Sequence, residues 1–149
     1  MTSRSVPVLI VDDQAFFRSA ARAVLAVTPG FAAVGEAGSG EEAVTRTDEL
    51  APALVLMDIH LPGISGIEAT RRIRATHPGT AVLLLSTYRV EDLPAEARDC
   101  GAIGYLHKED FEPEVREGAA RLILRLARAA AVRSGVAPGS GCCPPSGCE

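Results

Sequence analysis

The stretch LVLMDIHLPGISG, residues 54 to 66, decides the fold. It begins as an apolar run typical of a strand covered on both faces, and the run ends at Asp58. The loop that follows contains Pro62, Gly63 and Gly66, residues that favour turns and oppose a helix. We therefore predict that Asp58 lies at the end of a buried strand, with its carboxylate kept exposed by this loop.

Similar apolar runs recur along the chain and alternate with amphipathic segments. The runs typical of strands are residues 6–11, 32–37, 53–58, 81–86 and 103–108. Apolar residues at helical spacing occur in residues 15–27, 41–50 and 66–76. In the first of these segments, the residues that share the core-facing side are Phe17, Ala21, Val24 and Leu25. Parallel strands need crossover connections, which helices supply. The alternation therefore predicts an α/β fold, a doubly wound sheet of five parallel strands with helices on both faces.

Length and composition limit the classes of protein. The chain has 149 residues, of which 47% are hydrophobic, enough for one domain with its own core. Its formal charge of −4 and its lack of Trp disfavour a nucleic acid partner, so we expect no direct DNA binding. The first apolar run is too short for a signal peptide or a membrane span. We expect a cytoplasmic protein without a membrane partner.

Polar residues stand at the carboxyl ends of four of the five predicted strands. In chain order these residues are Asp12 and Asp13, Asp58, Ser86 and Thr87, and Lys108. They would converge at the carboxyl edge of the sheet, where such folds bind ligands. Three carboxylates in one pocket raise one another's pKa unless a cation intervenes, and Mg²⁺ suits carboxylate and phosphate oxygens. An ammonium and a hydroxyl would neutralise a phosphoryl group moving onto a carboxylate.

The motifs VLIVDDQ, LVLMDIHLPGISGIEATRRIR, LLLSTY and GAIGYLHKED occur in this order between residues 6 and about 130. This pattern resembles the receiver domain of two-component response regulators, especially the LuxR/NarL-like subgroup. The resemblance implies a flavodoxin-like (βα)5 fold and a phosphorelay function. It also implies Asp58 as the phosphoacceptor, with Mg²⁺ held by Asp12, Asp13, Asp58 and the backbone carbonyl of His60.

The same resemblance assigns the remaining site residues. Lys108 would pair with the phosphate, and Ser86, with Thr87 beside it, would supply the switch hydroxyl. Tyr105 would be the aromatic residue that moves inward when that hydroxyl engages the phosphate. His60 and Tyr88 would shape water access, and we hypothesise that their rings slow dephosphorylation.

Simpler interpretations exist for each residue alone. Asp12 and Asp13 could cap the following helix, and Asp58 and Lys108 could be solvated residues at strand ends. Ser86 and Thr87 could be ordinary strand-end hydrogen-bonding residues, and Tyr105 a half-buried aromatic. The His60 side chain has no neighbouring His or Cys at ligand spacing, which argues against a metal-binding imidazole. His77 and His107 are expected to be structural or solvated.

Two departures from the family pattern bear on the output surface. Glu109 follows Lys108 where many receivers have a proline, so we expect a trans peptide there. Pro94 falls within the expected fourth helix and is tolerated only in a first turn. We therefore predict that this helix begins near Leu93, after a loop over residues 88–92.

The C-terminal part of the chain has the most distinctive sequence features. We predict a receiver domain over residues 1–133 that ends in an extended helix at about 111–132, apolar on two sides and suited to a partner helix or a homodimer. Residues 134–149 are rich in Gly, Pro and Cys and are predicted to be disordered. Three cysteines lie in this segment, Cys142, Cys143 and Cys148. We expect them to be unpaired thiols; the alternative hypothesis is that they bind a metal or sense redox conditions.

The function expected from the sequence is a stand-alone response regulator. It would take a phosphoryl group from a sensor histidine kinase or a phosphotransfer protein and signal by contacts with an unknown output protein. It would assist its own phosphorylation and dephosphorylation without being an enzyme on an external substrate. One alternative is a phosphorylation-independent interaction or dimerisation module. Another is the receiver half of a LuxR/NarL-type DNA-binding regulator that lacks its helix-turn-helix, although the unusual tail favours a natural ending.

Overall fold

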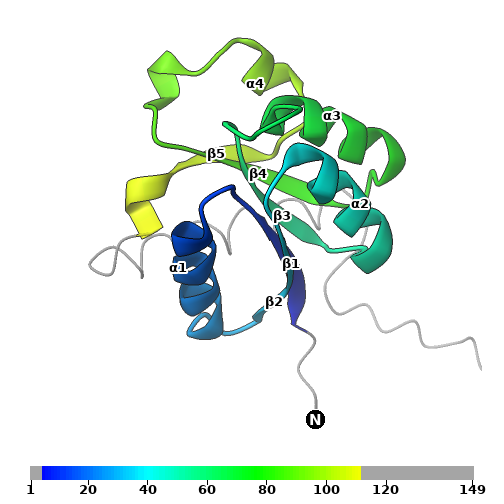
Figure 1. The fold of residues 1–149 in the computed structure, drawn as a ribbon, viewed down its shortest axis with the longest axis vertical. Helices are drawn as coiled ribbons and strands as arrows, with labels where there is room; N and C mark the ends of the chain where they lie inside the picture. The colour runs from blue at the N-terminus through cyan, green and yellow to red at the C-terminus, as the bar shows by residue number, and fades with distance from the viewer. Residues whose placement is uncertain (1–4, 112–149) are drawn as a thin grey trace, which may run out of the picture.

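The computed structural model describes residues 5–111 and contains one parallel sheet of five strands (Figure 1). The strands are β1 (Val6–Val11), β2 (Phe31–Ala37), β3 (Leu54–Asp58), β4 (Ala81–Ser86) and β5 (Gly104–His107). Their order across the sheet is β2-β1-β3-β4-β5, and every neighbouring pair is parallel. The predicted fold class is confirmed, and each strand lies within one residue of its predicted bounds at either end.

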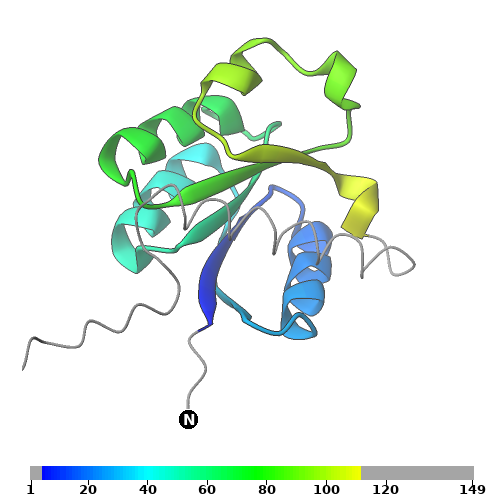
Figure 2. The same ribbon diagram turned by 180° about the vertical axis from the view of Figure 1, so that it is seen from behind.

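Helices cover both faces of the sheet, as Figures 1 and 2 show from opposite sides. The α-helices are α1 (Ala15–Ala26), α2 (Gly40–Leu50), α3 (Gly66–Thr76) and α4 (Glu96–Asp99). Two short 3₁₀ helices, η1 (Val90–Asp92) and η2 (Lys108–Phe111), flank α4 and β5. The cluster of buried residues on one face joins the sheet to α1, and the cluster on the other face joins it to α2, α3 and α4.

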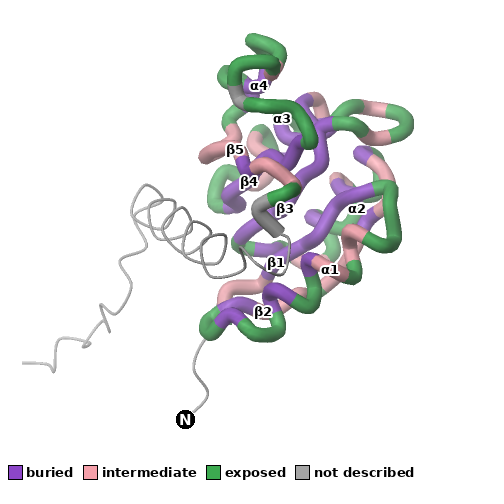
Figure 3. Tube along the Cα trace, turned by 90° about the vertical axis from the view of Figure 1, so that its left-hand side faces the viewer, coloured by how far each residue is buried: buried purple, intermediate pink, exposed green. Residues whose placement is uncertain are grey.

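The alternation of side chains along each strand divides the core between these faces. In β1, Val8 and Ile10 pack toward α1, whereas Leu9 and Val11 pack toward α2 and α3. Strand β3 is buried at all five positions because it lies in the middle of the sheet with helices on both sides (Figure 3). Its last residue, Asp58, is therefore held by the core up to the edge of the sheet.

The pairing of β1 with β2 contains one irregularity. Val8 pairs with Ala33 and Leu9 pairs with Gly35, so Val34 has no partner on β1. This arrangement is a β-bulge on an edge strand, and the Val34 side chain is exposed.

The α4 region differs from the prediction. The segment predicted as a loop over residues 88–92 contains η1, and α4 begins at Glu96 rather than near Leu93. The carbonyl of Pro94 accepts a hydrogen bond from the Ala97 N–H, which places the proline just before the helix. The helix ends after four residues, ahead of Gly101, whose φ of 95° no helix continues. Proline at one end and glycine at the other therefore shorten α4.

The described residues contain no cis peptide bond, in agreement with the trans peptide expected at Glu109. No helix of residues 5–111 is long and apolar enough to cross a membrane. The predicted helix at 111–132, the domain boundary at 133 and the cysteine-containing tail lie outside the described residues.

Candidate functional site

The site lies where the topology of the sheet reverses direction. From β1 the chain crosses to β2 on one side, and it then returns to β3 on the other side of β1. In parallel α/β folds, such a reversal opens a crevice at the carboxyl ends of the two central strands. Asp12 and Asp13 follow β1, and Asp58 ends β3, so all three lie at this reversal.

The three aspartates form one cluster. Each offers a carboxylate oxygen, and these oxygens all lie within 4.8 Å of one another. Asp12 is completely buried and Asp58 is only 3% exposed, whereas Asp13 is exposed. The prediction that the loop keeps the Asp58 carboxylate exposed is therefore wrong. Asp58 is buried because Lys108 and the backbone of residue 60 lie against its two oxygens.

Lys108 reaches this cluster from η2, at the far end of the described chain. Its Nζ lies 2.5 Å from Asp12 Oδ2 and 3.2 Å from Asp58 Oδ2. Burial acts to lower the pKa of Lys108, but the hydrogen bond to Asp12 and the charges of both carboxylates outweigh it and raise the pKa. Lys108 is therefore firmly cationic and joins two carboxylates from different strands.

The pKa of Asp58 is raised above its ordinary value. Burial is the largest cause, followed by the negative charge of Asp12; Lys108 and the hydrogen bond from His60 N–H oppose them. One ammonium therefore does not fully compensate the buried carboxylates. A cluster with excess negative charge and three carboxylates has the donor set that hard divalent cations prefer, so these residues could hold a metal ion.

The loop after β3 closes one side of the cluster. The His60 N–H donates a hydrogen bond to Asp58 Oδ1 at 3.3 Å. The His60 ring is exposed and meets the Tyr88 ring edge-on, with 5.0 Å between the ring centroids. These two aromatic side chains, from loops 28 residues apart in sequence, therefore lie together next to the backbone that bonds Asp58.

The end of β4 supplies the predicted hydroxyl groups. Ser86 is buried, and its Oγ accepts a hydrogen bond from the Tyr88 N–H at 3.0 Å. Thr87 is exposed, and its carbonyl accepts a hydrogen bond of 2.8 Å from His107 Nε2. The structure thus brings Ser86 to the same sheet edge as Asp58, while Thr87 contacts the end of β5 through its backbone.

Tyr105 points toward α4. Its hydroxyl donates a hydrogen bond to the Ala97 carbonyl at 2.5 Å, and partial burial raises its pKa. The ring packs with the core cluster that includes Ala97 and Cys100. Tyr105 therefore joins β5 to the short helix, consistent with the half-buried strand aromatic considered above.

His77, which was predicted to be structural or solvated, lies away from this site. Its Nε2 is 2.6 Å from Asp48 Oδ1, within hydrogen-bond distance.

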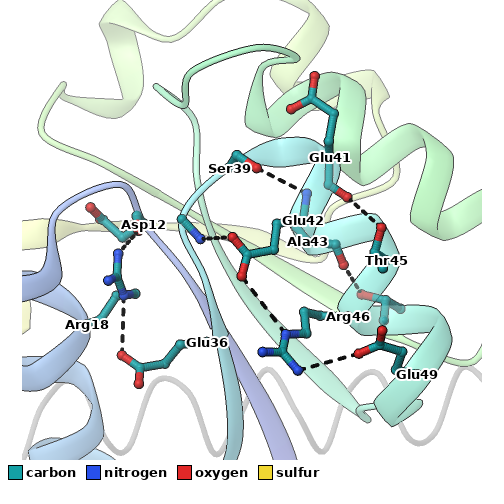
Figure 4. Close-up of polar contacts among 12 residues, drawn as sticks. Asp12, Arg18, Glu36, Ser39, Glu41, Glu42, Ala43, Thr45, Arg46 and Glu49 are labelled. Carbon is teal, nitrogen blue, oxygen red and sulfur yellow. Dashed lines mark hydrogen bonds and ion pairs between the residues drawn. The ribbon is translucent and has the colours of Figure 1, made fainter.

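Sequence reasoning missed several groups that support the site. Arg18 donates a hydrogen bond from Nη1 to the Asp12 carbonyl at 2.6 Å, and its Nε lies 3.3 Å from Glu36 Oε1 (Figure 4). Glu41 Oε1 accepts a hydrogen bond from the Ile64 N–H at 2.9 Å and so holds the loop after β3. That hydrogen bond is also the main reason why the pKa of Glu41 is lowered.

Phe17 was predicted only as part of the core-facing side of its helix. It does pack against the core, but its ring also lies under Lys108, with Nζ 4.7 Å from the ring centroid. A helical spacing cannot reveal this second contact, because it depends on a residue 91 positions later in the chain.

Comparison with known proteins identifies the class. The family model described as "Response regulator receiver domain" matches residues 8–119, so the chain belongs to the response regulator receiver family. The chain is 40% identical over 103 residues to the response regulator GacA of Pseudomonas protegens. That match covers 69% of this chain and 48% of GacA, so the chain spans about half the length of this relative.

Solved structures agree with this assignment. The signal receiver domain of NarL from Mycobacterium tuberculosis superimposes with a TM-score of 0.74 at 27% identity, covering 83% of this chain and 97% of that domain. A chain in the structure of the P1 domain of CheA3 in complex with CheY6 from R. sphaeroides gives a TM-score of 0.71 at 28% identity. The match covers 83% of this chain and 97% of that chain. The chain is thus a signalling module of two-component systems, as its sequence motifs predicted.

Proposed function

We propose that this chain accepts a phosphoryl group on Asp58 in a two-component phosphorelay. The observation that carries the proposal is the position of Lys108 Nζ between Asp12 and Asp58, at the edge of a three-carboxylate cluster. Such a site combines a nucleophilic oxygen, fixed positive charge and a place for a divalent cation. The family membership supports the same function.

Mg²⁺ is the cofactor that we propose for the cluster. Asp12, Asp13 and Asp58 would hold it together with the backbone carbonyl of His60. The raised pKa of Asp58 supports this assignment, because it indicates negative charge that one lysine leaves uncompensated. When bound, Mg²⁺ would neutralise charge on the phosphoryl oxygens and favour the ionised form of Asp58.

The transfer forms one bond and breaks one bond. A carboxylate oxygen of Asp58 forms a bond to phosphorus, and the bond between phosphorus and the donor group breaks, so the donor leaves with its electron pair. The ammonium of Lys108 would pair with a phosphoryl oxygen as negative charge gathers there. The Ser86 hydroxyl would donate a hydrogen bond to another phosphoryl oxygen.

Switching would begin with the hydroxyl at the end of β4. Ser86 Oγ accepts a hydrogen bond from Tyr88 in this structure, and turning toward a phosphoryl group would draw Ser86 and Thr87 toward Asp58. Tyr105 would then move inward, giving up its bond to the Ala97 carbonyl. Phosphorylation would bias two arrangements of the β4–α4–β5 surface that are already in equilibrium.

The paired rings of His60 and Tyr88 support a long-lived phosphoryl group. They lie in edge contact beside Asp58, where they would limit the approach of water. We expect a shorter phosphoryl half-life in His60→Ala and Tyr88→Ala, measured by loss of the adduct after the donor is removed. Unchanged half-lives in both variants would refute this role.

The donor we propose is a sensor histidine kinase or a phosphotransfer protein. The structurally similar CheY6 forms a complex with the P1 domain of CheA3, which supports a partner of this kind. An output protein would read the α4–β5 surface. The homodimer predicted through residues 111–132 stays a prediction, because that segment lies outside the described residues.

The test is intact-mass analysis after incubation with acetyl phosphate, with and without Mg²⁺. We expect one phosphoryl adduct in the wild type that requires Mg²⁺ and is absent in Asp58→Asn. Asp92→Asn, which changes an exposed aspartate of η1, is the matched control and should still form the adduct. A folded wild type that gains no phosphoryl group from acetyl phosphate or from candidate kinases would favour the phosphorylation-independent module instead.

A further inference from the structure

We propose that Phe17 is a positioning residue for the phosphoryl-transfer site, because its ring holds the ammonium of Lys108 against Asp12 and Asp58. The proposal rests on the proposed function. It concerns a residue of α1 whose ring contacts the Lys108 ammonium, and the role proposed for it is exerted through Lys108.

The position of the ring carries the argument. Phe17 lies in the first turn of α1, five residues after Asp12, and η2 lies beside this turn in both Figure 1 and Figure 2. The Nζ of Lys108 is 4.7 Å from the ring centroid, within the range of a cation–π contact. The ammonium therefore contacts an aromatic ring as well as the two carboxylates.

The surroundings make this contact stronger than one on an open surface. The Lys108 side chain is only 13% exposed, and both of its carboxylate partners are buried. An ammonium that is largely withdrawn from water gains more from the negative face of an aromatic ring than a solvated one does. Phe17 is itself packed against the core cluster around α1, so its ring is fixed in place.

Lys108 needs such a support because of where it lies. It follows the edge strand β5, and only Leu106 of that strand is buried. Its ammonium sits at the end of a flexible four-carbon stem, whose freedom must be restricted for productive transfer. The contacts with Asp12 and Asp58 restrict it on one side, and we infer that the Phe17 ring on α1 adds a further restriction.

The sequence provides an unusually clean readout. Lys108 is the only lysine among the 149 residues, so selective labelling of lysine with ¹³C gives one side-chain signal set. An aromatic ring close to the ammonium shifts the neighbouring methylene protons upfield. We expect this shift in the wild type and its loss in Phe17→Leu, without any metal or phosphodonor in the sample.

Phe16 supplies a matched control. It is the same residue type on the same helical turn, but it is 87% exposed. Phe16→Leu should keep both the lysine shift and the wild-type rate of adduct formation from acetyl phosphate. Phe17→Leu should form the adduct about three- to tenfold more slowly, as expected for losing one cation–π contact from a partly desolvated site.

A second variant separates the ring's charge distribution from its shape. Trifluorophenylalanine at position 17 keeps the size of Phe but weakens the negative face of the ring. We expect slower adduct formation in this protein, and Phe17→Tyr should retain most of the wild-type rate. Because the fluorinated ring fills the same space, this comparison remains informative even where Phe17→Leu fails to fold.

Two results would overturn the proposal: a lysine shift that persists in Phe17→Leu, or equal rates for wild type, Phe17→Leu and the fluorinated protein. Failure of the proposed function looks different, since the wild type itself would then form no adduct. The lysine signal reports on Phe17 in either case.

Discussion

Strands β3 and β5 each bring one charged residue to the same site, but they do so in different ways. β3 lies in the centre of the sheet, and all five of its residues are buried up to Asp58. β5 is an edge strand with one buried residue, and Lys108 follows it in a 3₁₀ helix. Core packing therefore fixes the carboxylate, whereas contacts of the lysine side chain itself fix the ammonium.

This difference assigns separate tasks to the two halves of the site. Asp58 cannot move without disturbing the core, which suits the role of nucleophile that we propose for it. The α4–β5 side is less buried and contains a four-residue helix. Such regions have lower local stability and respond to small changes in free energy. Four substitutions should distinguish the two halves, and the first has the largest expected effect.

Replacing Gly66 with Ala should break the β3 half of the site. A Cβ at position 66 would lie 2.0 Å from the Asp58 carbonyl oxygen, and this backbone atom cannot move aside at low cost. We expect a loss of about 3 kcal/mol in the free energy of unfolding, measured by urea denaturation. Gly79→Ala is the control, because a Cβ there meets nothing within 4 Å. Equal stability of the two variants would contradict the rigid packing inferred for β3.

Replacing Asp58 with Asn should stabilise the protein at neutral pH. The pKa of Asp58 is higher in the folded than in the unfolded state, so its ionisation opposes folding above the folded-state pKa. Without Mg²⁺, we expect a gain of about 1 to 2 kcal/mol in the free energy of unfolding at pH 7. The gain should shrink as the pH falls through the raised pKa and vanish below the unfolded-state value. A gain that is equal at pH 7 and pH 3 would show that charge burial is not its cause.

Replacing Tyr105 with Phe should affect the β5 half alone. The change removes the hydrogen bond from the tyrosine hydroxyl to the Ala97 carbonyl, for an expected loss of about 1 kcal/mol. Hydrogen exchange measured by mass spectrometry should speed up in α4 and remain unchanged in β3. Tyr88→Phe, at an exposed ring, is the control for stability. Faster exchange that spreads into β3 would mean that the two halves are one cooperative unit.

Replacing Glu41 with Gln should give the smallest effect. The Glu41 carboxylate accepts a hydrogen bond from the Ile64 N–H, and this bond lowers the pKa of Glu41. The stability that the ionised carboxylate contributes is therefore present above the unfolded-state pKa. It is lost as the pH falls through the lowered pKa of the folded state. Glu41→Gln should therefore lower the denaturation midpoint slightly at pH 7 and leave it unchanged near pH 2. Glu91→Gln, at an exposed residue of η1, is the control. A loss that persists near pH 2 would have a cause other than this charge.

The same contrast explains what could be predicted from the sequence. Strands such as β3 follow from apolar runs, and their shared direction brings Asp12, Asp58, Ser86 and Lys108 to one edge. The short α4, the burial of Asp58 and the contact of Phe17 with Lys108 could not be predicted. Each depends on contacts between distant segments, such as the one that joins Lys108 to Asp12 across 96 residues.

The bulge at Val34 has a consequence for the protein in solution. An edge strand with regular, unpaired backbone groups can add a strand from another molecule and start aggregation. In β2, the extra residue increases the local twist and interrupts the regular spacing of the backbone groups. The bulge therefore makes this edge of the sheet a less regular template for a further strand.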